Sequence, residues 1–98
     1  MNETQLKNKV LRMVRDKFPQ VWIQKIHDNI TSGIPDLLGC LNGRFFAIEL
    51  KVGRGKTTRL QAHTLARIEE AGGDILVGYT VEAVYGFLNA LKIESEVR

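Results

Sequence analysis

The dipeptide Asn42-Gly43 constrains the fold more than any other feature of this sequence of 98 residues. Asn-Gly between two apolar segments is the strongest short-range signal for a β-hairpin, because both residues readily adopt positive φ angles. We therefore predict strands at about Asp36–Leu41 and Arg44–Val52. A two-residue turn also fixes the register, and counting outward from the turn places Asp36 directly opposite Glu49.

Charged residues at the open end of this hairpin are the next constraint. Asp36 and Glu49 fall at a non-hydrogen-bonded pair, where the Cα atoms approach to about 4.5 Å. Side-chain alternation puts Lys51 on the same face as Glu49, whereas the other face is apolar and is expected to join the core. The hairpin therefore predicts two carboxylates and an ammonium group close together.

Two opposed carboxylates repel each other and lose hydration, so the pair needs a positive partner. Oxygen ligands from two acids, with other positions left to water and phosphate, are typical of Mg²⁺ or Mn²⁺. Lys51 would add a positive charge beside the metal, where it could activate a water or stabilise a phosphate. In the alternative interpretation, Lys51 forms an ion pair with one acid, which leaves the second acid without a partner.

The rest of the chain alternates helical and strand patterns. A capping box formed by Asn2 and Gln5 begins the first helix, and Gly72-Gly73 is a typical terminator of the second. The predicted helices are Glu3–Lys17, Thr58–Ala71 and one from about Thr80; the other strands are Val21–His27 and Asp74–Tyr79, with loops at Asp28–Gly33 and Gly53–Thr57. The order α-β-β-β-α-β-α indicates a single α/β domain over residues 1–98, built as helices around a mixed sheet.

Composition adds a partner class and a setting. The net charge is only +3, but basic residues cluster between residues 7 and 17 and again between Glu49 and Glu69, where no acid occurs. Such clusters suit nucleic acid, although solvated helix and loop surfaces explain them equally well. Cys40 is the only cysteine, so no internal disulfide is expected, and a cytoplasmic setting without signal peptide or membrane span fits best. Cys40 and Trp22 are expected to be core residues.

The hairpin residues resemble the signature of the PD-(D/E)xK nuclease superfamily, with Pro35-Asp36 in GIPDLLG and Glu49-Leu50-Lys51 in AIELK. More narrowly, the sequence is similar to small stand-alone members of the VRR-NUC family, which often occur in phages. The resemblance covers nearly the whole chain, because the same element order forms the core of that family. It implies a restriction-endonuclease-like fold with a mixed sheet flanked by helices.

The resemblance also implies site roles. Asp36 and Glu49 would bind Mg²⁺ or Mn²⁺, with the backbone carbonyl of Leu50 as a further ligand, and Lys51 would be the catalytic lysine. The glutamate that the family carries in its first helix corresponds to Glu3, which would be another metal ligand.

The glutamine that opens the second helix in the family corresponds to Gln61, which would act in catalysis. Both helix residues have structural alternatives. Glu3 would stabilise the helix dipole in any case, and Gln61 can close a capping box with Thr58.

Basic residues around the hairpin are candidates for contacts with DNA phosphates. They lie on the strand before it and in the loop after it: Lys25, His27, Arg54, Lys56 and Arg59. The sequence GRGKT lacks the spacing of a complete phosphate loop, so no nucleotide cofactor is expected.

These features together predict a metal-dependent DNA endonuclease that selects branched DNA such as Holliday junctions. One site per chain would then require a homodimer with two-fold symmetry, for which the last helix, with Val81, Tyr85, Phe87 and Leu88, is a candidate surface. The alternatives are a non-catalytic DNA-binding or assembly module with the same fold, and a flap-specific or sequence-specific nuclease.

Overall fold

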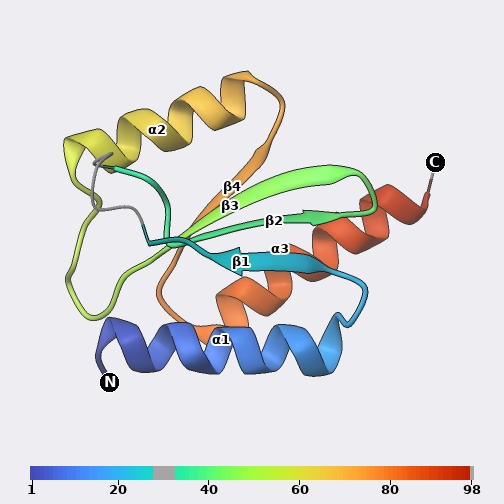
Figure 1. The fold of residues 1–98 in the computed structure, drawn as a ribbon, viewed down its shortest axis with the longest axis horizontal. Coiled ribbons are helices and arrows are strands. Elements are labelled where there is room, and N and C mark those ends of the chain that lie inside the picture. The colour runs from blue at the N-terminus through green and yellow to red at the C-terminus, as the bar shows by residue number, and fades with distance from the viewer. Residues whose placement is uncertain (28–32, 98) are drawn as a thin grey trace.

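The computed structural model describes residues 1–27 and 33–97 (Figure 1). Its elements are α1 (Glu3–Lys17), β1 (Trp22–Lys25), β2 (Leu37–Leu41), β3 (Arg44–Leu50), α2 (Arg59–Glu70), β4 (Asp74–Gly78) and α3 (Val81–Glu96). This is the predicted order α-β-β-β-α-β-α. Most of the predicted loop Asp28–Gly33 lies outside the described residues.

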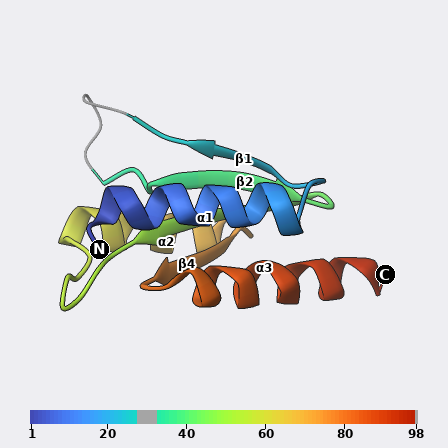
Figure 2. The same cartoon turned by 90° about the horizontal axis from the view of Figure 1, so that it is seen from below.

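The four strands form one mixed sheet in the order β1-β2-β3-β4. The first three strands are antiparallel to their neighbours, and β4 runs parallel to β3. Helices α1 and α3 cover one face of the sheet, and α2 covers the other (Figures 1 and 2). The fold is therefore the predicted α/β arrangement of a mixed sheet between helices.

The hairpin has the predicted turn and register. Asn42 and Gly43 have φ angles of 51° and 82°, as a two-residue turn with two positive φ angles requires. Leu41 pairs with Arg44, and Leu37 pairs with Ile48 at the other end of the ladder. Extending this register by one residue places Asp36 opposite Glu49, as predicted.

The main core lies between the sheet and the pair α1 and α3. It contains one apolar stripe from each helix and the inward face of β2 and β3: Leu6, Val10, Val14, Phe18, Leu37, Leu41, Phe46, Ile48, Leu50, Val84, Leu88 and Leu91. Because five consecutive residues of β3 are buried, this central strand is covered on both faces. It therefore provides a rigid support for residues at its end.

Strand bounds differ from the predictions at the edges of the sheet. Strand β1 is only four residues long, because it is an edge strand that pairs with β2 alone. Trp22 is 57% exposed, so its predicted core position is wrong; α2 packs against β4 and leaves this side of β1 uncovered. Strand β3 ends at Leu50 instead of Val52, and the backbone continues with a bond from the Lys51 N–H to the Gly78 carbonyl.

The last helix also differs from one expectation. Leu88 is fully buried in the core, so it cannot contribute to a surface for a second chain. Tyr85 is 42% exposed and its ring lies 5.4 Å from that of Phe18.

In the part of the chain that the structure describes, no helix is long and apolar enough to cross a membrane.

Candidate active site at the open end of the hairpin

Asp36 and Glu49 are tied together across the hairpin by reciprocal hydrogen bonds. The Asp36 backbone N–H donates to Glu49 Oε1 over 3.1 Å, and the Leu50 N–H donates to Asp36 Oδ2 over 2.8 Å. Each carboxylate therefore binds the backbone of the opposite chain segment. These bonds hold Asp36 in register although it lies one residue outside β2.

Each carboxylate also has its own lysine. Lys51 Nζ lies 3.3 Å from Glu49 Oε2, and Lys7 Nζ lies 3.3 Å from Asp36 Oδ1. The four side chains are largely shielded, with exposed fractions of 2% for Glu49, 11% for Lys51, 14% for Lys7 and 20% for Asp36. The centre thus contains two acids and two lysines and carries no net charge.

This pairing corrects one step of the sequence argument. An ion pair between Lys51 and one acid was expected to leave the other acid without a partner. Lys7 from α1 supplies that partner, so both acids are compensated within the chain. The charges alone therefore do not require a bound cation.

Gln61 closes the predicted capping box and also contacts the acid pair. Its Oε1 accepts from the Thr58 N–H over 2.9 Å, and its backbone N–H donates to Thr58 Oγ1, which completes the capping box of α2. Because the amide oxygen faces Thr58, the amide nitrogen is turned toward Glu49 Oε2 and donates to it over 2.8 Å. The cap of α2 thereby orients the Gln61 amide nitrogen toward the Glu49 carboxylate.

Glu49 has a perturbed titration. Burial raises the pKa of the Glu49 carboxyl above its usual value, and the nearby negative charge of Asp36 raises this pKa further. The Lys51 ammonium group and the Asp36 N–H act in the opposite direction without cancelling the rise. A buried carboxyl in this condition gains from any additional positive charge that approaches it.

Lys7 is the site residue that the sequence analysis missed. It follows the buried Leu6 in α1 and lies one helical turn after Glu3, so the side chains of Glu3 and Lys7 lie on the same side of the helix. Glu3 is only partly buried. Among the described residues, no three His, Cys, Asp or Glu side chains are grouped closely enough to share a metal, so the structure does not bring Glu3 together with the acid pair.

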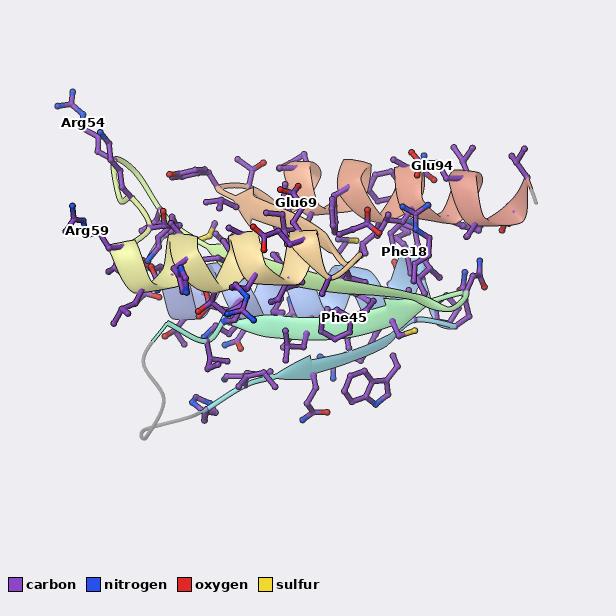
Figure 3. All side chains as sticks on the ribbon, turned by 90° about the horizontal axis from the view of Figure 1, so that it is seen from above. Phe18, Phe45, Arg54, Arg59, Glu69 and Glu94 are labelled. Atoms are coloured by element: carbon purple, nitrogen blue, oxygen red, sulfur yellow. The ribbon has the colours of Figure 1, made fainter. Side chains whose placement is uncertain are left out.

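The basic candidates surround this end of the molecule. Arg54 and Arg59 project outward at the same end (Figure 3), and Lys56 between them is exposed as well. The Tyr79 hydroxyl donates to the Gly55 carbonyl over 2.7 Å and so braces the loop that carries Arg54 and Lys56.

The two basic candidates before the hairpin lie at and beyond the end of β1. Lys25 is the last residue of β1, opposite Leu37, and is partly buried. His27 is exposed two residues further along the chain. Lys25 thus lies opposite Leu37, the residue that follows Asp36 in the chain.

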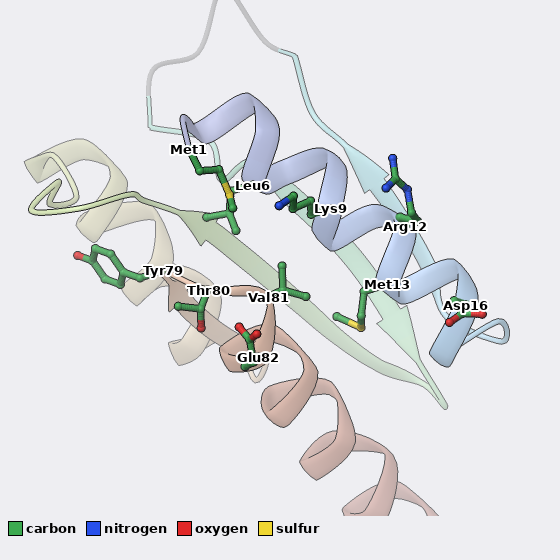
Figure 4. A pocket seen from close by; sticks show the side chains of 10 residues that line it. All are labelled: Met1, Leu6, Lys9, Arg12, Met13, Asp16, Tyr79, Thr80, Val81 and Glu82. Carbon is green, nitrogen blue, oxygen red and sulfur yellow. The ribbon is translucent and has the colours of Figure 1, made fainter.

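A groove of about 820 Å³ runs between α1 and the start of α3 (Figure 4). Its floor is apolar, and its rim carries charges of both signs; the lining residues are Met1, Leu6, Lys9, Arg12, Met13, Asp16, Tyr79, Thr80, Val81 and Glu82. None of the four charged residues of the hairpin centre lines it. The groove is therefore separate from the acid pair, and Tyr79 is the residue that connects its rim with the basic loop.

Comparison with known proteins identifies the fold. No protein-family model matches the sequence, and no curated protein matches it either. Among solved structures, the chain is similar to one described as a VRR_NUC domain, with a TM-score of 0.68 and 22% sequence identity over 84% of this chain and 92% of the other.

The chain has the VRR_NUC fold. This likeness confirms the fold that the resemblance implied.

Proposed function

We propose that this VRR_NUC-fold chain is a metal-dependent DNA endonuclease. The observation that carries the proposal is the reciprocal bonding of Asp36 and Glu49, with Lys51 3.3 Å from Glu49. Two acids and a lysine on one rigid strand end can hold a phosphodiester and a water in a fixed relation, which is the main requirement for phosphoryl-group chemistry.

The residues at this end suit Mg²⁺ or Mn²⁺. Asp36 and Glu49 offer carboxylate oxygens and Leu50 offers a backbone carbonyl, a set of hard donors that these cations prefer. Burial and the charge of Asp36 raise the pKa of Glu49, so a cation close to this carboxyl would stabilise its ionised form. Glu3, which the structure does not group with the acid pair, would join this set from α1 only if its side chain turned toward it. When bound, the cation lowers the pKa of a water and stabilises charge on the phosphate.

The chain's own residues have separate tasks in this proposal. Lys51 holds the attacking water or a phosphate oxygen through its ammonium group. Gln61 fixes the orientation of Glu49 through the amide bond of 2.8 Å. The basic residues at and after the end of β1, in the loop after β3 and at the start of α2 bind backbone phosphates and so position the DNA strand: Lys25, His27, Arg54, Lys56 and Arg59. Cleavage would leave a 5′-phosphate and a 3′-hydroxyl.

We further propose that branched DNA is the substrate and that the protein works as a homodimer in the cytoplasm, in the host cell if a phage encodes it. A domain of 98 residues has little surface for reading bases, so recognition of a branched shape is more economical. Cutting two symmetry-related strands of a junction needs two sites, and hence two chains related by a two-fold axis.

A non-catalytic DNA-binding module is the second candidate. The observation in its favour is that Lys7 and Lys51 already neutralise both acids, so the two carboxylates need no bound cation to balance their charge. Such a module would bind DNA through the basic loop and would cut none of it.

Cleavage of four-way junctions, flaps, splayed arms and plain duplex in Mg²⁺ or Mn²⁺ tests the proposal. We expect Asp36→Asn and Lys51→Ala to lower the cleavage rate by at least about 100-fold, whereas Glu69→Gln on the exposed side of α2 leaves it unchanged. Gln61→Glu keeps an oxygen for the cap of α2 but replaces the amide donor to Glu49 with a second negative charge, so it should lose activity and some stability. If Asp36→Asn or Lys51→Ala cuts DNA at the wild-type rate, the catalytic assignment is wrong. If the wild-type chain binds DNA but does not cut it, the result supports the non-catalytic module.

A further inference from the structure

Lys7 is placed unusually for a helix lysine. Its Nζ lies 3.3 Å from Asp36 Oδ1, and its side chain is only 14% exposed. Lys9, two residues along α1, is exposed, as expected for a lysine that only solvates a helix. Taking an ammonium group out of water is unfavourable unless an acid compensates for it, so the position of Lys7 depends on Asp36.

The two lysines reach the centre from different elements and pair with different acids. Lys51 follows β3 and lies beside Glu49, whereas Lys7 reaches Asp36 from α1. The four methylene groups of Lys7 let its ammonium group move several ångströms without any change in α1. Among the described residues, its ion pair is with Asp36, and none joins it to Glu3.

We propose that Lys7 occupies the cation position at Asp36 in the metal-free chain and transfers to a DNA phosphate when a divalent cation binds. This inference rests on the proposed function. A cation at Asp36 Oδ1 and an ammonium group at the same oxygen repel each other, so metal binding must displace Lys7. The nearest new anion is then a phosphate of the substrate strand, which brings its own negative charge to the centre.

The consequence is a coupling between metal and DNA. Lys7 weakens metal binding while DNA is absent, because the cation must compete with it for Asp36. Once the cation is bound, the released Lys7 strengthens the binding of DNA. By linkage, DNA that holds Lys7 away from Asp36 strengthens metal binding by the same factor.

Calorimetric titration of the whole chain with Mn²⁺ alone, without DNA, tests the first half. We expect Lys7→Gln to bind Mn²⁺ about tenfold more tightly than wild type. Lys9→Gln makes the same charge change two residues away, and its Mn²⁺ affinity should stay within about twofold of that of wild type. Lys7→Arg keeps the charge and should bind Mn²⁺ as wild type does. Thermal unfolding of each variant checks that the fold is retained.

Fluorescence anisotropy with labelled junction DNA tests the second half, using Ca²⁺ as a cation of the same charge. We expect Lys7→Gln to weaken DNA binding in Ca²⁺ and to leave it unchanged in EDTA, where wild-type Lys7 stays on Asp36. Equal Mn²⁺ affinity of Lys7→Gln and Lys9→Gln would overturn the inference, and so would unchanged DNA binding in Ca²⁺. If wild type binds Mn²⁺ and cuts DNA while Lys7→Gln gives either of these results, only the role of Lys7 is wrong. If wild type binds no Mn²⁺, the proposed function is wrong as well.

Discussion

Glu49 shows how one residue can be stabilised and perturbed by the same neighbours. Its carboxylate receives hydrogen bonds from the Asp36 N–H and from Gln61 and lies beside Lys51. Burial and the charge of Asp36 nevertheless raise its pKa. The folded chain therefore binds a proton at Glu49 more readily than the unfolded chain does.

This imbalance predicts a pH dependence of stability. The pKa of Glu49 is raised above 4.5 in the folded chain, so its contribution is fully present below the ordinary value and is lost as pH rises through the folded value. In EDTA, the free energy of unfolding of wild type should decline over this interval relative to that of Glu49→Gln. Urea unfolding between pH ~4 and ~7 measures the difference, with the exposed Glu69→Gln as the control. Parallel curves for wild type and Glu49→Gln would contradict the assignment of the shift.

At the scale of elements, the hairpin depends on a glycine as much as on its turn. Gly39 pairs with Phe46 across the hairpin and with Ile23 of β1. A Cβ on Gly39 would lie 2.3 Å from Phe46 Cζ and 2.6 Å from the Trp22 carbonyl oxygen. The absence of a side chain there lets the Phe46 ring lie against the strand.

Two glycine substitutions with opposite expected signs test this packing. Gly39→Ala should destabilise the fold by about 1–3 kcal/mol, because a core ring or a backbone segment must move. Gly86→Ala in α3 meets no atom within 4 Å and should stabilise the fold by about 0.5–1 kcal/mol, because alanine favours a helix. Urea unfolding of both variants provides the measurement. Equal effects of the two substitutions would show that the close contact at Gly39 relaxes without cost.

What the sequence could predict at this scale follows from how far each contact reaches along the chain. The hairpin register and the cap of α2 are local: Asn42-Gly43 and the spacing of Thr58 and Gln61 determine them. The approach of Lys7 to Asp36 depends on how α1 packs across the sheet. The exposure of Trp22 depends on how far the face of the sheet is covered by α2. Helical spacing puts Lys7 on the same side of α1 as Glu3, but no short pattern encodes which acid Lys7 meets or whether a helix covers Trp22. The second lysine was therefore missed, and the predicted position of the tryptophan was wrong.

At the scale of the whole molecule, the two ends of the hairpin differ in their contacts. At the turn, Arg44 donates to both carboxylate oxygens of Asp74 and to Glu94, and Asn42 donates to Ser95. These bonds join β3, β4 and α3. The opposite end carries the acid pair and the basic loop. The turn end is thus fixed by bonds to β4 and α3, whereas the opposite end carries the charged side chains of the candidate site.

A second chain is the last component that the proposed cleavage of a junction requires. Among the predicted interface residues Val81, Tyr85, Phe87 and Leu88, Tyr85 is the exposed one, at 42%. We expect Tyr85→Glu to convert a dimer into a monomer by light scattering, since a charge in an apolar interface is unfavourable. The monomer should cut junctions on one strand at a time and lose the paired cuts, while the rate of single nicking per chain stays the same. Trp22→Ser at the free edge of β1 is the matched control; a monomer produced by this variant and not by Tyr85→Glu would place the interface at β1 instead of α3.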